Sequence, residues 1–263
     1  MSKMTTRRKL AIATWSAPRE GNIYGKLTVD ADALLDWIEK ERERTGVKVT
    51  VTHAVGKAVA KALAAAPGLN GRIAWGRFVP HDNVSVTFLV VLDGGSDLAK
   101  AKVADADKKG VSAIAGELGG LALKLREGKD ENFEKSKGTL KMLPTWIIRP
   151  MISAVGWLTG ALGINIPALG LEGFPFGSAI VTSVGMFGLD EGFVPPTPFA
   201  RVPVYVLVGA VKPRPTVVEG EIVIRQQMTI TATIDHRFID GFQGGVLAKV
   251  VREALENPET LDD

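Results

Sequence analysis

The segment VVEGEIVIRQQMTITATI, residues 217–234, places the strongest constraint on the fold, because it combines a turn with strict alternation. One face of its second half carries apolar side chains, at Met228, Ile230, Ala232 and Ile234. The other face carries Thr229, Thr231 and Thr233. Alternation with a period of two is typical of a β-strand, and Glu-Gly suits a hairpin turn. The segment therefore predicts a β-hairpin whose second strand lays an apolar face on a core.

Helical and strand-like segments follow one another along the rest of the chain. Apolar residues recur with helical spacing in four segments, at 30–44, 51–66, 111–127 and 244–255. Runs rich in β-branched and aromatic residues predict strands within 83–92, 178–188 and 195–211. We find no repeat and no low-complexity linker. The pattern predicts one α/β domain spanning residues 1–263.

An apolar segment at 150–171, PMISAVGWLTGALGINIPALGL, contains no charged residue. Its length approaches that of a membrane-spanning helix, but its glycines and Pro167 dilute the hydrophobicity. We expect it to form a buried hairpin, a partner interface or a shallow contact with a membrane surface.

Composition excludes several classes of site. The 263 residues include no cysteine, which removes disulfides, thiolate catalysis and cysteine-based metal sites. The formal net charge is only +3 with acidic and basic residues mixed, so we expect no nucleic-acid partner. No cluster of ligands predicts a metal. The basic N-terminus lacks the apolar core of a secretory signal, and we expect a cytoplasmic protein, with membrane association through the apolar segment as the alternative.

His236 stands at the end of the predicted alternating strand, in TATIDHRFIDGFQGG. Continued alternation places it on the face of Ile234, so that the imidazole points toward the apolar side of the sheet. Asp240 and Gly241 follow in a turn, where a carboxylate fixes local geometry and glycine permits a tight backbone. The residues alone allow two interpretations: a hydrogen-bonded structural histidine, or a base that takes a proton from a thiol or hydroxyl.

The motif DHRFIDG, residues 235–241, resembles the D-H-R-x-x-D-G signature of the catalytic domain of dihydrolipoamide acyltransferases from 2-oxo acid dehydrogenase complexes. Chloramphenicol acetyltransferase and condensation domains share a shorter form of this pattern. Two further stretches, residues 27–73 and 183–211 with its GMFG run, also resemble that family. The resemblance implies a two-layer sandwich of mixed β-sheet and helices, similar to chloramphenicol acetyltransferase, and an acyltransferase that uses acyl-CoA as substrate.

The resemblance also implies roles for individual residues. His236 matches the general base that deprotonates the thiol of CoA or dihydrolipoamide. Alignment on GMFG brings Thr182 to the position of a serine that stabilises the oxyanion, and Ser183 to the next position, so either hydroxyl is a candidate donor.

A structural role is implied for Asp240, as the partner of an arginine that holds the histidine loop in shape. The candidate arginines are Arg237, beside the histidine, and Arg7 or Arg8, near the N-terminus. Gly241 completes the motif. His53 and His81 match no functional position.

Four departures from the family pattern bear on function. Residues 142–176 form an apolar insertion, and LDGGSDLAKAKV at 92–103 replaces a segment that shapes the thiol channel in the family. Nothing resembles a lipoyl domain, so we expect no covalent lipoyl group on this chain. The family implies a homotrimer with the active site between subunits, while the acidic C-terminus disfavours a larger cage.

Two functions follow: a stand-alone acyltransferase, whose insertion lines a pocket for a longer acyl chain, or a non-catalytic trimeric scaffold that binds a membrane or protein partner through 145–172.

Overall fold

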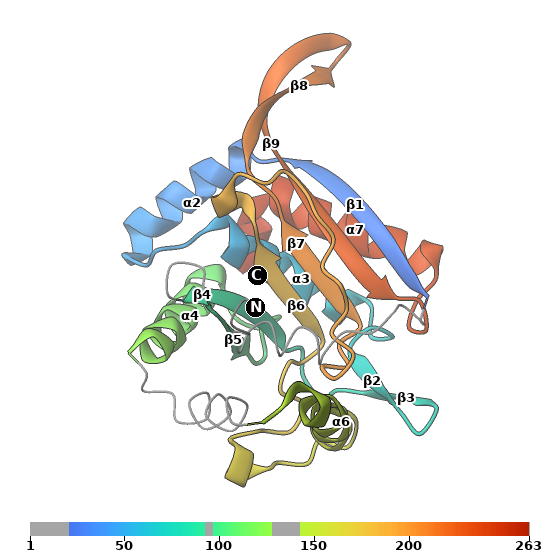
Figure 1. The fold of residues 1–263 in the computed structure, drawn as a ribbon. Coiled ribbons are helices and arrows are strands. Elements are labelled where there is room, and N and C mark those ends of the chain that lie inside the picture. Colours follow the sequence, from blue (N-terminus) through green and yellow to red (C-terminus); the bar gives the residue numbers. More distant parts are fainter. Residues whose placement is uncertain (1–20, 93–96, 128–142, 263) are drawn as a thin grey trace, which may run out of the picture.

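The computed structural model describes residues 21–92, 97–127 and 143–262 of the chain. The strands in it are β1 (Asn22–Asp30), β2 (Gly71–Ala74), β3 (Arg77–Pro80), β4 (Val86–Leu92), β5 (Asp97–Val103), β6 (Ala179–Ser183), β7 (Val204–Val208), β8 (Lys212–Val218) and β9 (Glu221–Asp235). Seven of them form a mixed sheet in the order β1-β9-β7-β6-β4-β5, with β8 paired to β9 (Figure 1). β2 and β3 form a separate hairpin.

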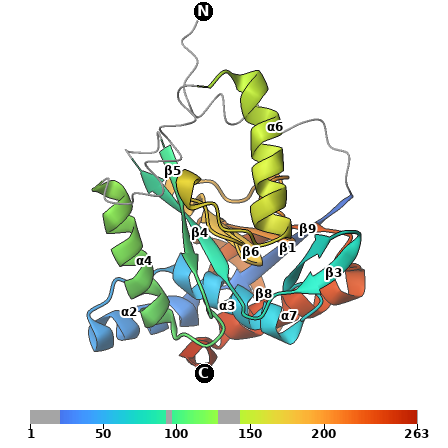
Figure 2. The same cartoon turned by 90° about the horizontal axis from the view of Figure 1, so that it is seen from below.

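Helices cover one face of the sheet and give the second layer. They are α2 (Asp32–Thr45), α3 (Val51–Ala65), α4 (Val111–Arg126) and α7 (Gly241–Glu256). A further helix, α6 (Thr145–Gly156), stands on the opposite side of the sheet (Figure 2). Every helix and strand predicted from the sequence has its counterpart here within a few residues. The architecture is the α/β sandwich that the resemblance implied.

The main core lies between the sheet and helices α3, α4 and α7. Helix α3 is buried along most of its length because it is built from small and apolar residues, including Ala54, Val55, Ala58, Val59, Ala62 and Leu63. It lies so close to β4 that a Cβ atom on Gly56 would come within 2.2 Å of the Phe88 ring. Glycine at this position is therefore what lets the helix approach the strand.

The long strand β9 confirms the predicted alternation. Met228, Ile230 and Ile234 are buried on the helix-covered face. The threonines of the opposite face are buried too, and the hydroxyl of Thr231 donates to the carbonyl oxygen of Gly192. Both faces of this half of β9 are therefore covered, and within the sheet the strand is flanked by β1 and β7.

An arm projects from the sheet where β8 pairs with the first half of β9 (Figure 1). Val217, Ile222 and Ile224 are 69–77% exposed on this arm. At its base, Asp190 pairs with Lys212 at 2.5 Å and with Arg214 at 3.3 Å. The arm thus presents apolar side chains away from the core, and ion pairs at its base connect β8 to Asp190.

The apolar insertion folds as α6 and a π-helical turn, Trp157–Ala161, followed by short turns. It docks on the β2–β3 hairpin, where the rings of Trp157 and Trp75 meet edge to face at 5.2 Å. Arg72 donates from Nε to the carbonyl oxygen of Ala161 at 2.8 Å and stacks 4.2 Å from the centre of the Phe174 ring. Across the described ranges, no helix is long and apolar enough to cross a membrane.

Candidate active site

His236 lies in the turn that joins β9 to α7. The strand ends at Asp235, so the alternation ends one residue before the histidine. The prediction that the imidazole points into the apolar side of the sheet is therefore wrong, because His236 is exposed in the isolated protomer. The turn is closed by backbone bonds from the His236 N–H to the Gly21 oxygen (3.2 Å) and from the Phe238 N–H to the Asp235 oxygen (3.1 Å).

One hydrogen bond determines which ring nitrogen of His236 carries the proton. Nδ1 of His236 lies 2.6 Å from the carbonyl oxygen of Ile239. A carbonyl oxygen only accepts, so Nδ1 carries the proton and donates. In the neutral ring the lone pair then belongs to Nε2, the nitrogen that can act as a base. The short turn thus selects one tautomer of the histidine.

Asp240 is the N-cap of α7. Its carboxylate accepts from the backbone N–H groups of Phe242 (3.0 Å) and Gln243 (3.2 Å), and the Gln243 side chain accepts from the Asp240 N–H at 3.1 Å. This is a complete capping box, and it satisfies donors that the first helical turn leaves unpaired. Asp240 therefore supports the histidine turn by starting the helix that follows it.

The expected pairing of Asp240 with Arg237 is wrong. The Arg237 guanidinium instead forms a double contact with Asp235, with Nε at 2.9 Å and Nη2 at 2.5 Å from its carboxylate oxygens. A separation of two residues at the end of a strand brings these two side chains together. Arg7 and Arg8 lie outside the described residues. Gly241 begins α7 without a left-handed backbone, so its predicted tight turn is not observed.

Thr182 and Ser183 lie at the end of β6, far from His236 of the same chain. Thr182 pairs with Leu207, which in turn pairs with Thr231 of β9. His236 is five residues further along β9, about 17 Å at the usual rise, and two strands away, about 10 Å. The Ser183 hydroxyl donates to the Val208 oxygen at 3.4 Å, whereas Thr182 makes no hydroxyl bond within the described part of the chain. One chain therefore does not bring its predicted base and hydroxyl together.

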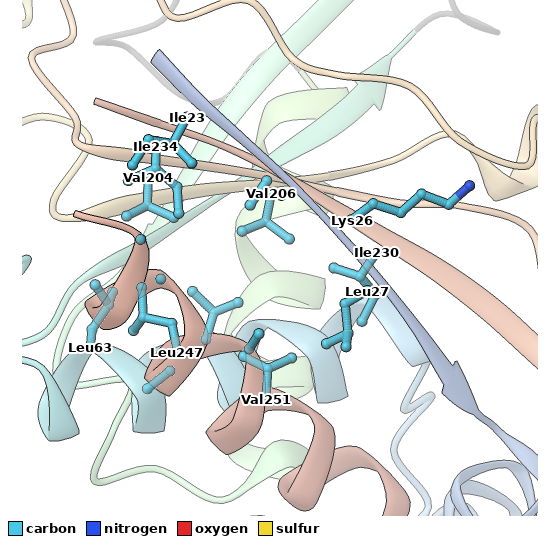
Figure 3. Close-up of a pocket in the computed structure, with 17 residues that line it drawn as sticks. Ile23, Lys26, Leu27, Leu63, Val204, Val206, Ile230, Ile234, Leu247 and Val251 are labelled. Atoms are coloured by element: carbon cyan, nitrogen blue, oxygen red, sulfur yellow. The ribbon is translucent and has the colours of Figure 1, made fainter. Parts of the chain in front are cut away.

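A cavity that the sequence did not predict lies beneath β1 and β9, next to the histidine turn (Figure 3). It measures about 280 Å³ and is bounded by the sheet above and by α3 and α7 below. Small residues at Gly25, Ala62, Ala232, Gly244 and Ala248 leave the space open. These small residues were the sequence signal from which the cavity could have been predicted. They line it from four different elements, β1, α3, β9 and α7.

The two other histidines lie apart from this turn. Burial, together with nearby Arg42, lowers the pKa of His53 to about 4, and its Nδ1 accepts from the Thr50 N–H. Burial, together with nearby Arg72, likewise lowers the pKa of His81 to about 4. The described residues hold no group of three or more side chains suited to bind a metal ion.

Known proteins resemble this chain over nearly its whole length. The family described as 2-oxoacid dehydrogenases acyltransferase (catalytic domain) matches residues 4–142 and 168–262. The mitochondrial dihydrolipoyllysine-residue succinyltransferase component of the Saccharomyces cerevisiae 2-oxoglutarate dehydrogenase complex is 26% identical over 239 residues, which are 89% of this chain and 42% of that protein. The chain spans about half the length of the curated relatives it matches.

Solved structures share the fold. A probable dihydrolipoamide acetyltransferase from Listeria monocytogenes superposes with a TM-score of 0.70 at 21% identity, covering 98% of this chain and 94% of that one. Chloramphenicol acetyltransferase superposes with a TM-score of 0.52 at 12% identity, covering 97% of this chain and all of the other. Sequence match and fold agree, and the chain belongs to the family of 2-oxoacid dehydrogenase acyltransferase catalytic domains.

Proposed function

We propose that this protein transfers an acyl group between CoA and a thiol acceptor, with His236 as the general base. The observation that supports this most directly is the bond between Nδ1 and the Ile239 carbonyl oxygen, because it leaves Nε2 free to take a proton. Relatives named as dihydrolipoyllysine-residue succinyltransferases and acetyltransferases support the reaction class.

The residues carry the reaction as follows. A thiol titrates near about 8.5, so at neutral pH it needs a base to become nucleophilic. Nε2 of His236 takes the proton as the sulfur attacks the carbonyl carbon of the acyl thioester, and the carbonyl electron pair moves onto oxygen. The carbon–sulfur bond to the departing thiolate then breaks as the carbonyl re-forms. The departing thiolate takes the proton back from Nε2, and atoms and charge balance.

The oxyanion requires a hydrogen-bond donor, and neither Thr182 nor Ser183 of the same chain lies near His236. We assign it to Thr182 of a neighbouring subunit, in a homotrimer whose sites lie between copies. Thr182 is the better candidate than Ser183, since its hydroxyl is uncommitted within the described residues while that of Ser183 donates to Val208. In a cyclic homotrimer the three interfaces are identical, so this arrangement, once formed between two copies, supplies all three sites.

The test is transfer from a panel of acyl-CoAs to dihydrolipoamide and small dithiols, comparing wild type with His236→Ala. Loss of a general base costs about 10²–10⁴-fold in rate. A fall of that size supports the proposal. A folded protein that transfers no acyl group to any of these thiols overturns it and favours a non-catalytic scaffold.

A further inference from the structure

We propose that the cavity beneath β1 and β9 binds the apolar chain of the acyl group, so that the preferred substrate is a medium-chain acyl thioester. This inference rests on the proposed function and adds the substrate class to it. The described part of the insertion, residues 143–176, contributes no residue to the cavity, so this pocket is not the one that the sequence led us to expect there.

The walls of the cavity are suited to a hydrocarbon chain. Ile230, Ile234, Leu247 and Val251 point into it from the sheet and from α7 (Figure 3). Among the described residues that line it, the one charged residue is Lys26, whose amine points away from the cavity in Figure 3 and pairs with Glu191. A pocket lined almost entirely by apolar groups disfavours a charged or hydroxylated chain, because most such groups would be buried without hydrogen bonds.

One end of the cavity lies next to the histidine turn, although His236 itself does not line it. Ile23 and Ile234 line its near end, and each lies two residues from a partner in the bond that joins Gly21 to His236. Gly241 lines the same end, at the start of α7. From there the cavity continues under the sheet to Leu27 and Val251. A thioester held at His236 can therefore extend its alkyl chain directly beneath β1 and β9.

The volume sets the length of that chain. An engineered apolar cavity of about 150 Å³ holds one benzene molecule, which has six carbons. A cavity of about 280 Å³ is nearly twice as large. It therefore accommodates roughly eight to twelve carbons in an extended or gently folded chain. An acetyl group would leave most of this apolar space unfilled.

Two glycines provide a direct way to fill the cavity. A Cβ atom on Gly25 of β1 would meet nothing within 4 Å, and one on Gly244 of α7 would meet only Cδ1 of Ile239, at 3.8 Å. Neither glycine has a left-handed backbone, so a larger residue fits without strain in the chain. Gly245, the next residue of the same helix, is exposed, does not line the cavity and also has open space around it.

The experiment compares Gly244→Leu with Gly245→Leu, which changes the same helix at a position outside the cavity. Binding of acetyl-, hexanoyl- and decanoyl-CoA is measured by calorimetry, and kcat/KM by transfer to dihydrolipoamide. Each methylene moved out of water strengthens binding by about fourfold. We expect wild type and Gly245→Leu to favour decanoyl-CoA, and Gly244→Leu to lose this preference by at least about tenfold. Gly25→Val, which fills the cavity from the sheet, provides a second variant should the helix change impair folding.

The outcomes separate the two proposals. If acetyl-CoA is turned over and affinity does not rise with chain length, the pocket assignment is wrong while the acyltransferase stands. An equal loss of preference in Gly244→Leu and Gly245→Leu also rejects the pocket. If no acyl-CoA is turned over but decanoyl-CoA binds more tightly than acetyl-CoA and Gly244→Leu abolishes the difference, the pocket stands and the proposed reaction fails.

Discussion

The imidazole of His236 is held by Ile239, whose carbonyl oxygen lies 2.6 Å from Nδ1, and Ile239 directly precedes the capping residue of α7. The position of that carbonyl depends on how the helix begins. The orientation of the base is therefore coupled to the N-cap, Asp240, four residues away from it in sequence.

Asp240→Ala should lower both stability and turnover. Loss of an N-cap costs about 0.5–2 kcal/mol, and the released turn no longer holds the Ile239 oxygen against Nδ1. Urea unfolding gives the first quantity and acyl transfer the second. Asp240→Asn keeps an acceptor at the cap, so we expect it to restore most of both. If the asparagine variant is as stable as wild type yet as slow as the alanine variant, the carboxylate has a role other than capping.

Thr182→Val should reduce kcat by about 10²–10³-fold, the usual cost of removing one oxyanion donor. Ser183→Ala should have a much smaller effect, because that hydroxyl already donates to the Val208 oxygen. Steady-state kinetics on the two variants decides between them. The reverse order would assign the oxyanion donor to Ser183.

Subunits carrying His236→Ala and subunits carrying Thr182→Val should complement each other when co-expressed. Each homogeneous protein lacks one group at every site, but a mixed trimer contains interfaces where both groups are intact. Random assembly from equal amounts restores about a quarter of the sites. Activity of separately tagged and co-purified mixtures measures this. Mixed trimers without recovered activity would place both groups in the same subunit.

Stability should increase with pH between about 4 and 6.5, in part because of His53. Its folded pKa of about 4 lies below the unfolded value of 6.5, so the unfolded state binds more protons in this window. The stabilisation is complete above the unfolded pKa and is lost as pH falls toward the folded one. His53→Gln keeps an acceptor for the Thr50 N–H and should reduce the slope of unfolding free energy by at most about 1.4 kcal/mol per pH unit. An unchanged slope would assign this pH dependence to other groups, with His81 the next candidate.

Arg72→Lys should loosen the insertion without unfolding the sheet. Lysine cannot both stack flat on Phe174 and donate sideways to Ala161. Loss of these contacts should lower the local opening free energy of residues 143–176 by about 1–3 kcal/mol. Limited proteolysis followed by mass spectrometry measures the cleavage rate there. Arg77→Lys, an exposed change on the same hairpin, is the matched control and should leave the rate unchanged.

Patterns within one segment predicted the elements well, because they depend only on neighbouring residues. The alternation from Met228 to Ile234 and the helical spacing of α3 are examples. Strand order is set by contacts between distant segments, so the separation of Thr182 from His236 could not be predicted from local sequence patterns. The role of Asp240 was open to prediction: Asp240 followed three residues later by Gln243 is the pattern of a capping box. The end of β9 could not be predicted in this way, because it depends on Asp235 pairing with Asn22 of β1.

Among the described strands, β8 of the arm pairs only with β9, so its other edge is free, which in many proteins invites aggregation. In β8, Pro213 and Pro215 lie opposite Gln226 and Ile224 of β9. Proline has no N–H, so at these two positions the outer edge of β8 offers no donor to an added strand. Copies of the protein therefore cannot stack arm to arm in an unlimited sheet. The chain can therefore display Ile222 and Ile224 to solvent with little risk of forming fibres.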